Sequence, residues 1–385
     1  NPLHQMIRLL TIVVFFICSS LSFGAWTEFY TDPSGSNLNA GSTNATTAVY
    51  TSAGGDSDGT SVFTPADGST PDSSVAVGDW GSVYVTAGAT TATFIGRVTA
   101  VAAGVNGAVT FSTTAKSGTF PAASAGAHTI TLKTGGAWRG PNGAVGFPFG
   151  FITNALTNAS LHPPCVNLKA GTYSITAAMT HNNAGPTMFA GYTTTPRDGG
   201  RAIIDGGTTG ASYVVLTSSS DSLLLQDMDF QNNGATGSAD GTLITGSRTV
   251  IFRCTWSGMR RHGLSSQANM QAESCEFFGN NLSNTSGGFS GVAFAGSGSK
   301  IVRCRSHHNT GSNAGGFYMD SSVTLINCIA DHNGANGILS NGDVNQSFYS
   351  CDLYANGGAG LFFTGGSQSM QSSIVNCAFT KNGGY

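Results

Sequence analysis

The sequence predicts an all-β protein whose larger part is a solenoid, a single-stranded right-handed parallel β-helix. Three observations support this fold class. Six cysteines recur 21 to 29 residues apart, a mostly apolar residue lies three positions before each, and an asparagine lies five positions after all but the first. The cysteines are Cys254, Cys275, Cys304, Cys328, Cys351 and Cys377. A period of about 25 residues is typical of a solenoid, because each repeat buries its apolar face only against its neighbours.

Composition agrees with this fold class. The chain has 385 residues, of which 54 are glycine and only 9% are charged, and it is rich in Ser, Thr and Asn. Such a composition favours many short strands joined by turns over long helices. The formal net charge is −3 and the sequence has no basic stripe, so we expect no nucleic-acid partner.

The first 25 residues read as a secretory signal peptide. Residues 1–5 precede Met6, the expected start, and Arg8 supplies a weak positive region before the apolar run of residues 9–17. Small residues before Ala25 suit cleavage. The alternative is a membrane anchor, but the run is short for a bilayer span. We therefore expect a secreted protein, extracellular, periplasmic or on the cell surface, with no membrane span once the signal is removed.

Residues 26–135 are predicted to form an N-terminal β module with loops. A short strand near Tyr30 leads into a turn, and Gly, Ser, Asn and Asp then dominate to about residue 73, which favours loops. The later part contains short β-forming runs separated by Gly, Asn and Ala turns, at residues 82–85, 93–98, 109–112 and 128–132. The module contains no cluster of histidines or carboxylates, so attachment or capping is its expected role.

Residues 136–164 are predicted to cap the solenoid. Their apolar residues favour a short amphipathic helix over residues 151–158. Because the end of a solenoid exposes apolar surface and unpaired strand edges, such a helix would cover both.

The β-helix itself is predicted over residues 165–385. Each regular repeat from Leu223 onward reads as a strand, an Asn or Ser kink, a short strand, an Asn-Gly turn and a third strand. The last repeat ends at Tyr385 without a terminal cap, so we expect further coils beyond this sequence.

The two recurring residue types have structural explanations. Stacked at about 4.8 Å per coil, the cysteines are expected to form a file of buried, reduced thiols, with disulfides as the alternative. The asparagines suit a turn that needs left-handed backbone angles, and their side chains can hydrogen-bond from coil to coil. They are Asn233, which follows Met228 in an earlier unit, and Asn280, Asn309, Asn333, Asn356 and Asn382.

This pattern resembles the pectate-lyase-like superfamily of secreted right-handed β-helix proteins. The resemblance is carried by residues 166–175, 185–207, 323–337 and 373–383, and it extends over about residues 136–385. It implies the architecture but no single activity, because the superfamily includes polysaccharide lyases, glycoside hydrolases, epimerases, phage tailspikes and surface proteins without enzymatic activity. Polygalacturonase motifs are not found, and Arg261-His262-Gly263 is only a partial match.

The resemblance to lyases also implies carboxylates that hold calcium and an Arg or Lys base. Asp227 and Asp229 flank Met228, and two residues at i and i+2 of a strand share a face. They are therefore candidate calcium ligands. A turn role explains Asp227 equally well, because it occupies the kink position that Asn327 and Asn376 occupy in later repeats.

Stacking the repeats brings together a second set of candidates. Three positions after the cysteine lie His307, Asp331 and Tyr354, and the next position holds His308 and His332. One coil apart, His307 and Asp331 are expected to form an acid/base couple, with Arg303 and Arg305 binding an acidic sugar or a phosphate. The predicted catalytic residues are His307, Asp331 and Arg305, and the predicted substrate-binding residues are Arg303, His308, His332, Tyr354, Arg260 and Arg261. The alternatives are ordinary solvated turn residues or, for His308 and His332, a metal pair.

Three functions follow from this reading. The first is a polysaccharide-active enzyme, a lyase acting on acidic glycans by β-elimination in preference to a hydrolase, with calcium as a candidate cofactor. The second is a non-catalytic glycan-binding adhesin or a tailspike-like surface protein, and the third is a purely structural solenoid. The expected partner in the first two is a polysaccharide or a cell-surface glycan.

Overall fold

The computed structural model describes most of the chain. The described residues are 27–31, 49–73, 75–77, 80–87, 90–118, 128–134, 164–176, 178–181, 186–267, 269–283, 290–294, 296–311, 314–341, 345–364 and 372–383. The predicted signal peptide and the predicted helix over residues 151–158 lie outside them. Among the described residues, no helix is long and apolar enough to cross a membrane.

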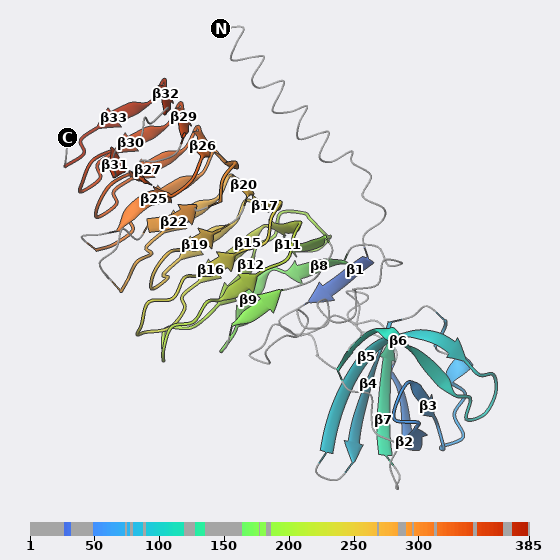
Figure 1. Cartoon of the computed structure of the whole chain (residues 1–385). Coiled ribbons are helices and arrows are strands. Elements are labelled where there is room, and N and C mark those ends of the chain that lie inside the picture. The colour runs from blue at the N-terminus through green and yellow to red at the C-terminus, as the bar shows by residue number, and fades with distance from the viewer. Residues whose placement is uncertain are drawn as a thin grey trace, which may run out of the picture.

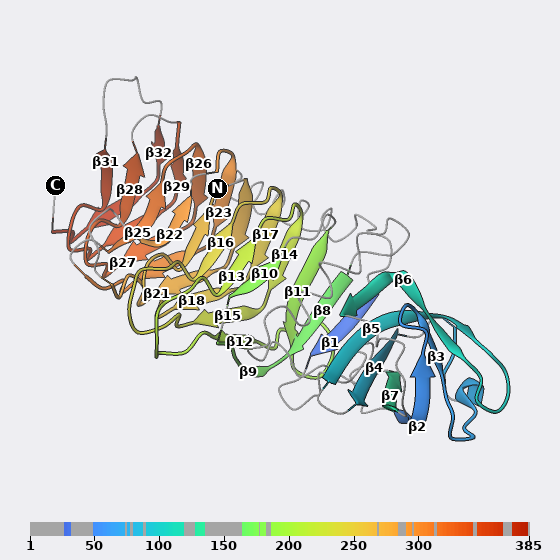
Figure 2. The same cartoon turned by 60° about the horizontal axis from the view of Figure 1, so that its bottom comes forward.

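The larger part is a right-handed parallel β-helix made of three sheets, as predicted (Figures 1 and 2). In order of pairing, sheet I consists of β1 (Thr27–Thr31), β8 (Pro164–Lys169), β11 (Thr187–Tyr192), β14 (Leu223–Gln226), β17 (Thr249–Phe252), β20 (Met270–Glu273), β23 (Ser299–Val302), β26 (Val323–Ile326), β29 (Ser347–Tyr349) and β32 (Ser373–Val375).

The chain passes from sheet I to sheet II and then to sheet III in each coil. Sheet II consists of β9 (Gly171–Ser174), β12 (Ala202–Asp205), β15 (Met228–Gln231), β18 (Thr255–Ser257), β21 (Glu276–Phe278), β24 (Arg305–His307), β27 (Ile329–Asp331), β30 (Asp352–Tyr354) and β33 (Ala378–Thr380). Sheet III consists of β10 (Met179–His181), β13 (Leu216–Ser218), β16 (Thr242–Ile244), β19 (Leu264–Ser266), β22 (Ser290–Phe294), β25 (Gly315–Met319), β28 (Ile338–Asn341) and β31 (Leu361–Thr364).

The N-terminal module is a closed antiparallel barrel that precedes β8 in the chain. Its strands pair in the order β2 (Val49–Ser57), β3 (Val62–Thr64), β6 (Val109–Gly118), β5 (Thr90–Val101), β4 (Trp80–Ala87) and β7 (His128–Thr134), and a 3₁₀ turn, η1, covers Pro71–Ser73. The four predicted β runs fall in β4 to β7. Strands β2 and β3 lie where the composition favoured loops, because pairing with β7 and β6 outweighs a Gly- and Ser-rich sequence.

Strand β1 belongs to the β-helix rather than to the barrel. It pairs in parallel with β8 from Thr27↔Pro164 to Thr31↔Leu168, so that the barrel is inserted between two neighbouring strands of sheet I. The predicted module over residues 26–135 therefore contributes its first strand to the solenoid. Figure 1 shows the barrel near the end of the solenoid where β1 and β8 lie.

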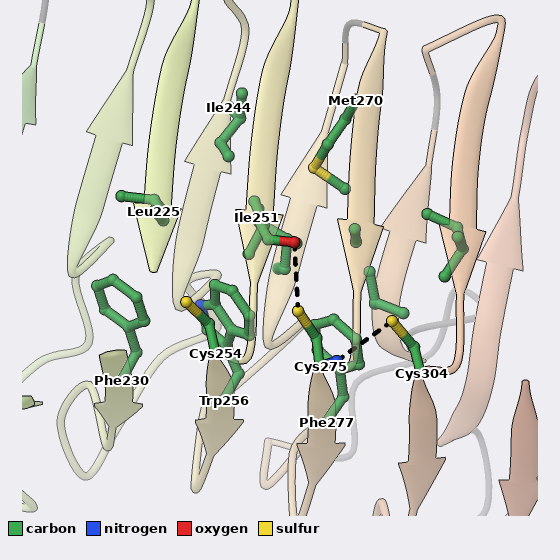
Figure 3. Close-up of a cluster of buried hydrophobic side chains, with 14 of the residues drawn as sticks. Leu225, Phe230, Ile244, Ile251, Cys254, Trp256, Met270, Cys275, Phe277 and Cys304 are labelled. Carbon is green, nitrogen blue, oxygen red and sulfur yellow. Dashed lines mark hydrogen bonds between the residues drawn. The ribbon is translucent and has the colours of Figure 1, made fainter. Parts of the chain in front are cut away.

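The core of the β-helix is built from rows of equivalent side chains. The buried rings of Phe230, Trp256 and Phe277 stack on one another along sheet II, with successive centroids 5.2 Å apart (Figure 3). Next to them, Cys254, Cys275 and Cys304 follow one another in single file, and the N–H of Cys275 donates to Cys304 Sγ over 3.4 Å (Figure 3). All described cysteines are free thiols, which confirms the predicted reduced file.

Two left-handed turn positions in each coil produce the corners on either side of sheet II. The residue before the cysteine has φ near +54°, as in Asn327 (φ 54°), and so does the residue four positions after it, as in His332 (φ 53°). The asparagine one position further on is not among the residues with positive φ. The explanation of this asparagine by left-handed angles is therefore wrong, and the explanation by hydrogen bonding is correct.

Those hydrogen bonds form a continuous ladder. Asn333 Oδ1 accepts from both the N–H and Nδ2 of Asn309, and Asn333 Nδ2 donates to the carbonyl of Ser306 and to Asn356 Oδ1. Asn356 repeats the pattern toward Asn382. Because these backbone groups lie in the buried corner, the amide side chains satisfy donors and acceptors that water cannot reach.

Candidate functional site

The outward face of sheet II carries a cluster of titratable and aromatic side chains, here called the His–Asp patch. It consists of Glu276, Phe278, Arg305, His307, His308, Asp331, His332 and Tyr354. Side chains alternate along each strand, so Ser306 of β24 is buried in the core while Arg305 and His307 project outward. Strands β21, β24, β27 and β30 hold the patch, and the left-handed turn after sheet II adds His308 and His332.

The register predicted from the cysteine spacing is confirmed. His307 lies directly opposite Asp331, which in turn lies opposite Tyr354. Phe278 occupies the equivalent position one coil before His307, and the two rings stack with centroids 5.3 Å apart. The same register sets Glu276 beside Arg305.

Asp331 is the fully buried centre of the patch. Its carboxylate accepts Nε and Nη2 of Arg305 over 2.9 and 2.8 Å, and Oδ2 also accepts from Nδ1 of His332 over 2.9 Å. Burial alone would raise the pKa of this carboxyl, but the hydrogen bonds from Arg305 and His332 outweigh burial and lower its pKa to about 2. Asp331 is therefore ionised at neutral pH and holds two cationic or donor groups in place.

His332, rather than His307, is the imidazole that Asp331 orients. Because an ionised carboxylate only accepts hydrogen bonds, Nδ1 of His332 carries a hydrogen and Nε2 of the neutral ring has a free electron pair. The side chain of His332 is 48% exposed, so the ring is accessible from solvent. Tyr354 lies edge-on to the ring of His332, with centroids 5.5 Å apart.

The predicted acid/base couple between His307 and Asp331 is corrected accordingly. His307 is adjacent to Asp331, but its Nε2 lies 2.8 Å from Glu276 Oε1 and its Nδ1 lies 2.8 Å from Nδ1 of His308. His307 is hydrogen-bonded to Glu276 of the preceding coil, whereas Asp331 accepts from Arg305 and from His332, the turn residue that follows it. His308 stacks on His332, with centroids 5.0 Å apart and planes within 7°.

The remaining predicted binding residues lie away from this patch. Arg303 occupies the left-handed corner before Cys304 and is paired with Glu273 of sheet I. Arg260 and Arg261 lie in the turn after β18, where Arg261 Nε is 3.6 Å from Asp240 and Arg260 Nε donates to the carbonyl of Gly237.

The two candidate calcium ligands are both bound to arginines. Asp227 accepts two hydrogen bonds from Arg253 over 2.7 and 2.6 Å and adopts the left-handed corner conformation, while Asp229 is paired with Arg201. Among the residues that the structure describes, no three His, Cys, Asp or Glu side chains are grouped to hold a metal ion. These carboxylates do not fit a calcium site, because each already has a cation as its partner.

Sequence reasoning missed Glu276 and Phe278, although the repeat contains the signal for both. Glu276 follows Cys275 by one position, as Arg305 follows Cys304, and Phe278 occupies the position of His307 in the preceding coil. Listing every residue in those two positions would have added them. The hydrogen-bond partners of His332 and His307, in contrast, have no signal in the spacing.

Comparisons with known proteins agree with the fold. Residues 212–385 match the family model described as right handed beta helix region. Pectate lyase Pel9A is similar in structure, with a TM-score of 0.44 and 17% identity over 58% of this chain and 71% of that one. ORF18 of Geobacillus virus E2 has a TM-score of 0.43 and 16% identity over 63% of this chain and 58% of its own length.

A third solved structure, the periplasmic alginate epimerase AlgG, has a TM-score of 0.34 and 13% identity, and the match covers 57% of this chain and 58% of the epimerase. The present chain thus spans less than two thirds of the viral protein and of the epimerase. No curated protein matches the sequence. At these identities the similarity concerns the fold alone. The chain contains a right-handed β-helix region over residues 212–385.

Proposed function

We propose that the protein acts on an acidic polysaccharide by β-elimination at the His–Asp patch. The observation that carries this proposal is the arrangement of Asp331, which is buried and ionised and binds both Arg305 and His332. Asp331 thereby holds a base, His332, and a cation, Arg305, next to each other on the surface. β-Elimination from a uronate needs these two groups.

In the proposed reaction, Nε2 of His332 removes the proton on the carbon next to the uronate carboxylate. The electron pair left on that carbon forms a double bond as the carbon–oxygen bond at the β position breaks, and Tyr354 supplies a proton to the departing oxygen. Asp331 stabilises the imidazolium that forms, because its negative charge lies 2.9 Å from Nδ1.

Arg305 is assigned to the substrate carboxylate. Its hydrogen bonds to Asp331 use Nε and one hydrogen of Nη2, which leaves Nη1 and the other Nη2 hydrogen as a second two-pronged edge. The hydrogen bond to Asp331 raises the pKa of Arg305 more than burial lowers it, so the guanidinium stays charged. Neutralising the uronate in this way would acidify the proton that His332 removes, and no step requires calcium.

The proposal is tested with purified protein and a panel of uronate polysaccharides, with added calcium or with EDTA. The measurements are the ultraviolet absorbance of unsaturated uronate and the release of reducing ends. We expect both signals with at least one substrate and a fall in kcat of about 100-fold or more in His332→Asn, since general-base catalysis contributes roughly 10² to 10⁴. Asparagine is chosen because it tolerates the left-handed backbone of this position.

The matched control is Lys381→Asn. Lys381 occupies the same left-handed turn position two coils further on, at φ 54°, and is outside the patch. It should leave activity unchanged. If the wild-type protein forms unsaturated product and His332→Asn is equally active, the assignment of His332 as the base is wrong. If no substrate yields unsaturated product or new reducing ends, the proposal of an enzymatic function is wrong.

Glycan binding without catalysis is the second candidate. The observation that favours it is the row of rings along the patch, where Phe278 stacks on His307 and His308 stacks on His332 next to Tyr354. Aromatic and imidazole rings in such a row can pack on sugar rings. Oligouronate binding by calorimetry without any product would support this candidate over the lyase.

A further inference from the structure

We propose that His308 is a second substrate-contacting imidazole, equivalent to His332 and one coil away, and that the two histidines bind successive sugars of a glycan lying parallel to the solenoid axis. The inference rests on the proposed function because it concerns the same patch. It adds a binding residue and a direction for the substrate chain.

The first step of the argument is that the same local geometry occurs twice. His308 and His332 occupy the same turn position, with φ of 50° and 53°. Each places Nδ1 against the side chain of the residue before it: His308 contacts His307 over 2.8 Å and His332 contacts Asp331 over 2.9 Å. The backbone angles are nearly equal and each Nδ1 faces the preceding side chain, and the two ring planes differ by only 7°.

The second step concerns the hydrogens on these rings. Glu276 is an acceptor when ionised, so the hydrogen between it and His307 belongs to Nε2 of His307. In the neutral ring, Nδ1 of His307 is then an acceptor, and Nδ1 of His308 must donate to it. Nε2 of His308 therefore has a free electron pair, as Nε2 of His332 does. Glu276 and Asp331 thus fix the same tautomer in both exposed rings.

The third step is the spacing of the two acceptors. The rings lie on successive coils and are parallel, with centroids 5.0 Å apart, so two equivalent imidazoles follow one another in the stacking direction of the coils. An extended polysaccharide presents the same hydroxyl or the same proton at each repeat of its chain. Two equivalent acceptors in a row along the axis suit a chain that runs across β24 and β27, and they do not suit one that runs along a single strand.

The row of imidazoles is two residues long. The same turn position holds Gly279 in the coil before His308 and Ala355 in the coil after His332, so neither neighbour supplies an acceptor side chain. Desolvation and the two neighbouring histidines lower the pKa of His308, which favours the neutral ring over the charged one.

The test compares His308→Asn, His332→Asn and the control Lys381→Asn with galacturonate and guluronate, from the monosaccharide upward. In His308→Asn we expect Kd for the monosaccharide, which a single imidazole can hold, to stay at the wild-type value. We expect KM and Kd to rise about tenfold for longer oligomers only, which is the loss of one hydrogen bond of about 1.4 kcal/mol. A purely structural role would not depend on oligomer length.

The outcomes separate this inference from the lyase proposal. Equal weakening of oligomer binding in both histidine variants, with no product from wild type, would support the inference and contradict the lyase. If His308→Asn binds every oligomer with the wild-type Kd while His332→Asn loses activity, the inference about His308 is wrong and the lyase proposal stands. Nitrogen-15 NMR of the imidazoles gives a readout without substrate: we expect the Nδ1–H tautomer in both rings, and the Nε2–H tautomer in His308 would overturn the inference.

Discussion

At the residue scale, the hydrogen bonds of a buried polar side chain in this protein are made mainly with residues of the neighbouring coils. Asn333 illustrates this point, since all its hydrogen-bond partners lie 23 to 27 residues away in the sequence. Each buried backbone group that such an amide satisfies would cost about 1 to 3 kcal/mol if left unpaired. The asparagine file therefore has a structural role, as its position inside every regular repeat predicted.

His181 makes the stability of the protein depend on pH. It is fully buried in β10, its Nδ1 lies 3.0 Å from Ser218 Oγ, and burial lowers its pKa to about 4 from the ordinary 6.5. The unfolded chain therefore takes up this proton first as pH falls. The contribution of the neutral ring is fully present above pH 6.5, and it is lost as pH falls toward about 4.

Over that range the wild-type free energy of unfolding should fall by about 3 kcal/mol because of this residue. His181→Gln keeps a polar partner for Ser218 but has no titratable group. Urea unfolding at closely spaced pH values should show a flatter pH dependence in the variant, after correction for any change in the denaturant slope. The same steepness in both proteins would rule out His181 as the cause.

The residue scale also shows where sequence reasoning was sufficient. The cysteine register placed His307 opposite Asp331, because a fixed period converts sequence distance into stacking. It did not show that Asp331 binds His332, because this contact depends on a left-handed turn that brings His332 back over the preceding carboxylate.

At the element scale, the short strands of the β-helix are stable only as members of a stack. Most strands have three or four residues, too few to be stable alone, and each pairs in parallel with the equivalent strand of the next coil. Strand β1 extends sheet I by one member beyond β8. It thereby covers an edge that would otherwise present unpaired N–H and C=O groups.

Replacing Tyr30 with proline tests the role of β1. Tyr30 lies opposite Asn167 of β8, and its ring meets that of Tyr192 edge-on with centroids 6.1 Å apart. Proline fixes φ and is poorly tolerated in a paired strand, so we expect weaker pairing of β1, faster amide exchange along residues 164–169 and a lower melting temperature. Hydrogen–deuterium exchange measures the first effect, and Tyr30→Phe is the control that keeps both ring and donor. Unchanged exchange in β8 would contradict the pairing.

The turns between sheets explain why some elements were predictable and others were not. Asn, Ser and Gly before and after sheet II were readable as turn residues, since they tolerate positive φ. Arg303 and Ala355 adopt the same angles without that preference, so the stacking of neighbouring coils imposes the turn on them. Strands β2 and β3 are a parallel case in the barrel, where long-range pairing decides the conformation.

At the scale of the whole molecule, the reactivity of the stacked cysteine thiols measures whether the coils remain stacked. Burial raises the pKa of Cys254, Cys304 and Cys328 well above its ordinary value, so these thiols stay protonated and poorly nucleophilic.

We therefore expect Cys254, Cys304 and Cys328 to be protected from alkylation in the native protein. With increasing urea, thiols of different coils should become reactive at different urea concentrations, because in a solenoid each coil is stabilised by its immediate neighbours. Pulsed alkylation followed by peptide mass spectrometry measures these concentrations. Simultaneous labelling of the whole file at one urea concentration would instead indicate a single cooperative unit.

The sequence by itself determined the period of the solenoid, the rows of residues that face its core and the set of side chains that share each turn. It could do so because a regular coil maps spacing directly onto stacking. Only the tertiary structure decided that β1 joins sheet I across the inserted barrel, and that Asp331 holds His332 and Arg305 while Glu276 holds His307. Those choices depend on long-range strand pairing, side-chain rotamers and the bending of the chain at left-handed corners, which no repeat in the sequence records.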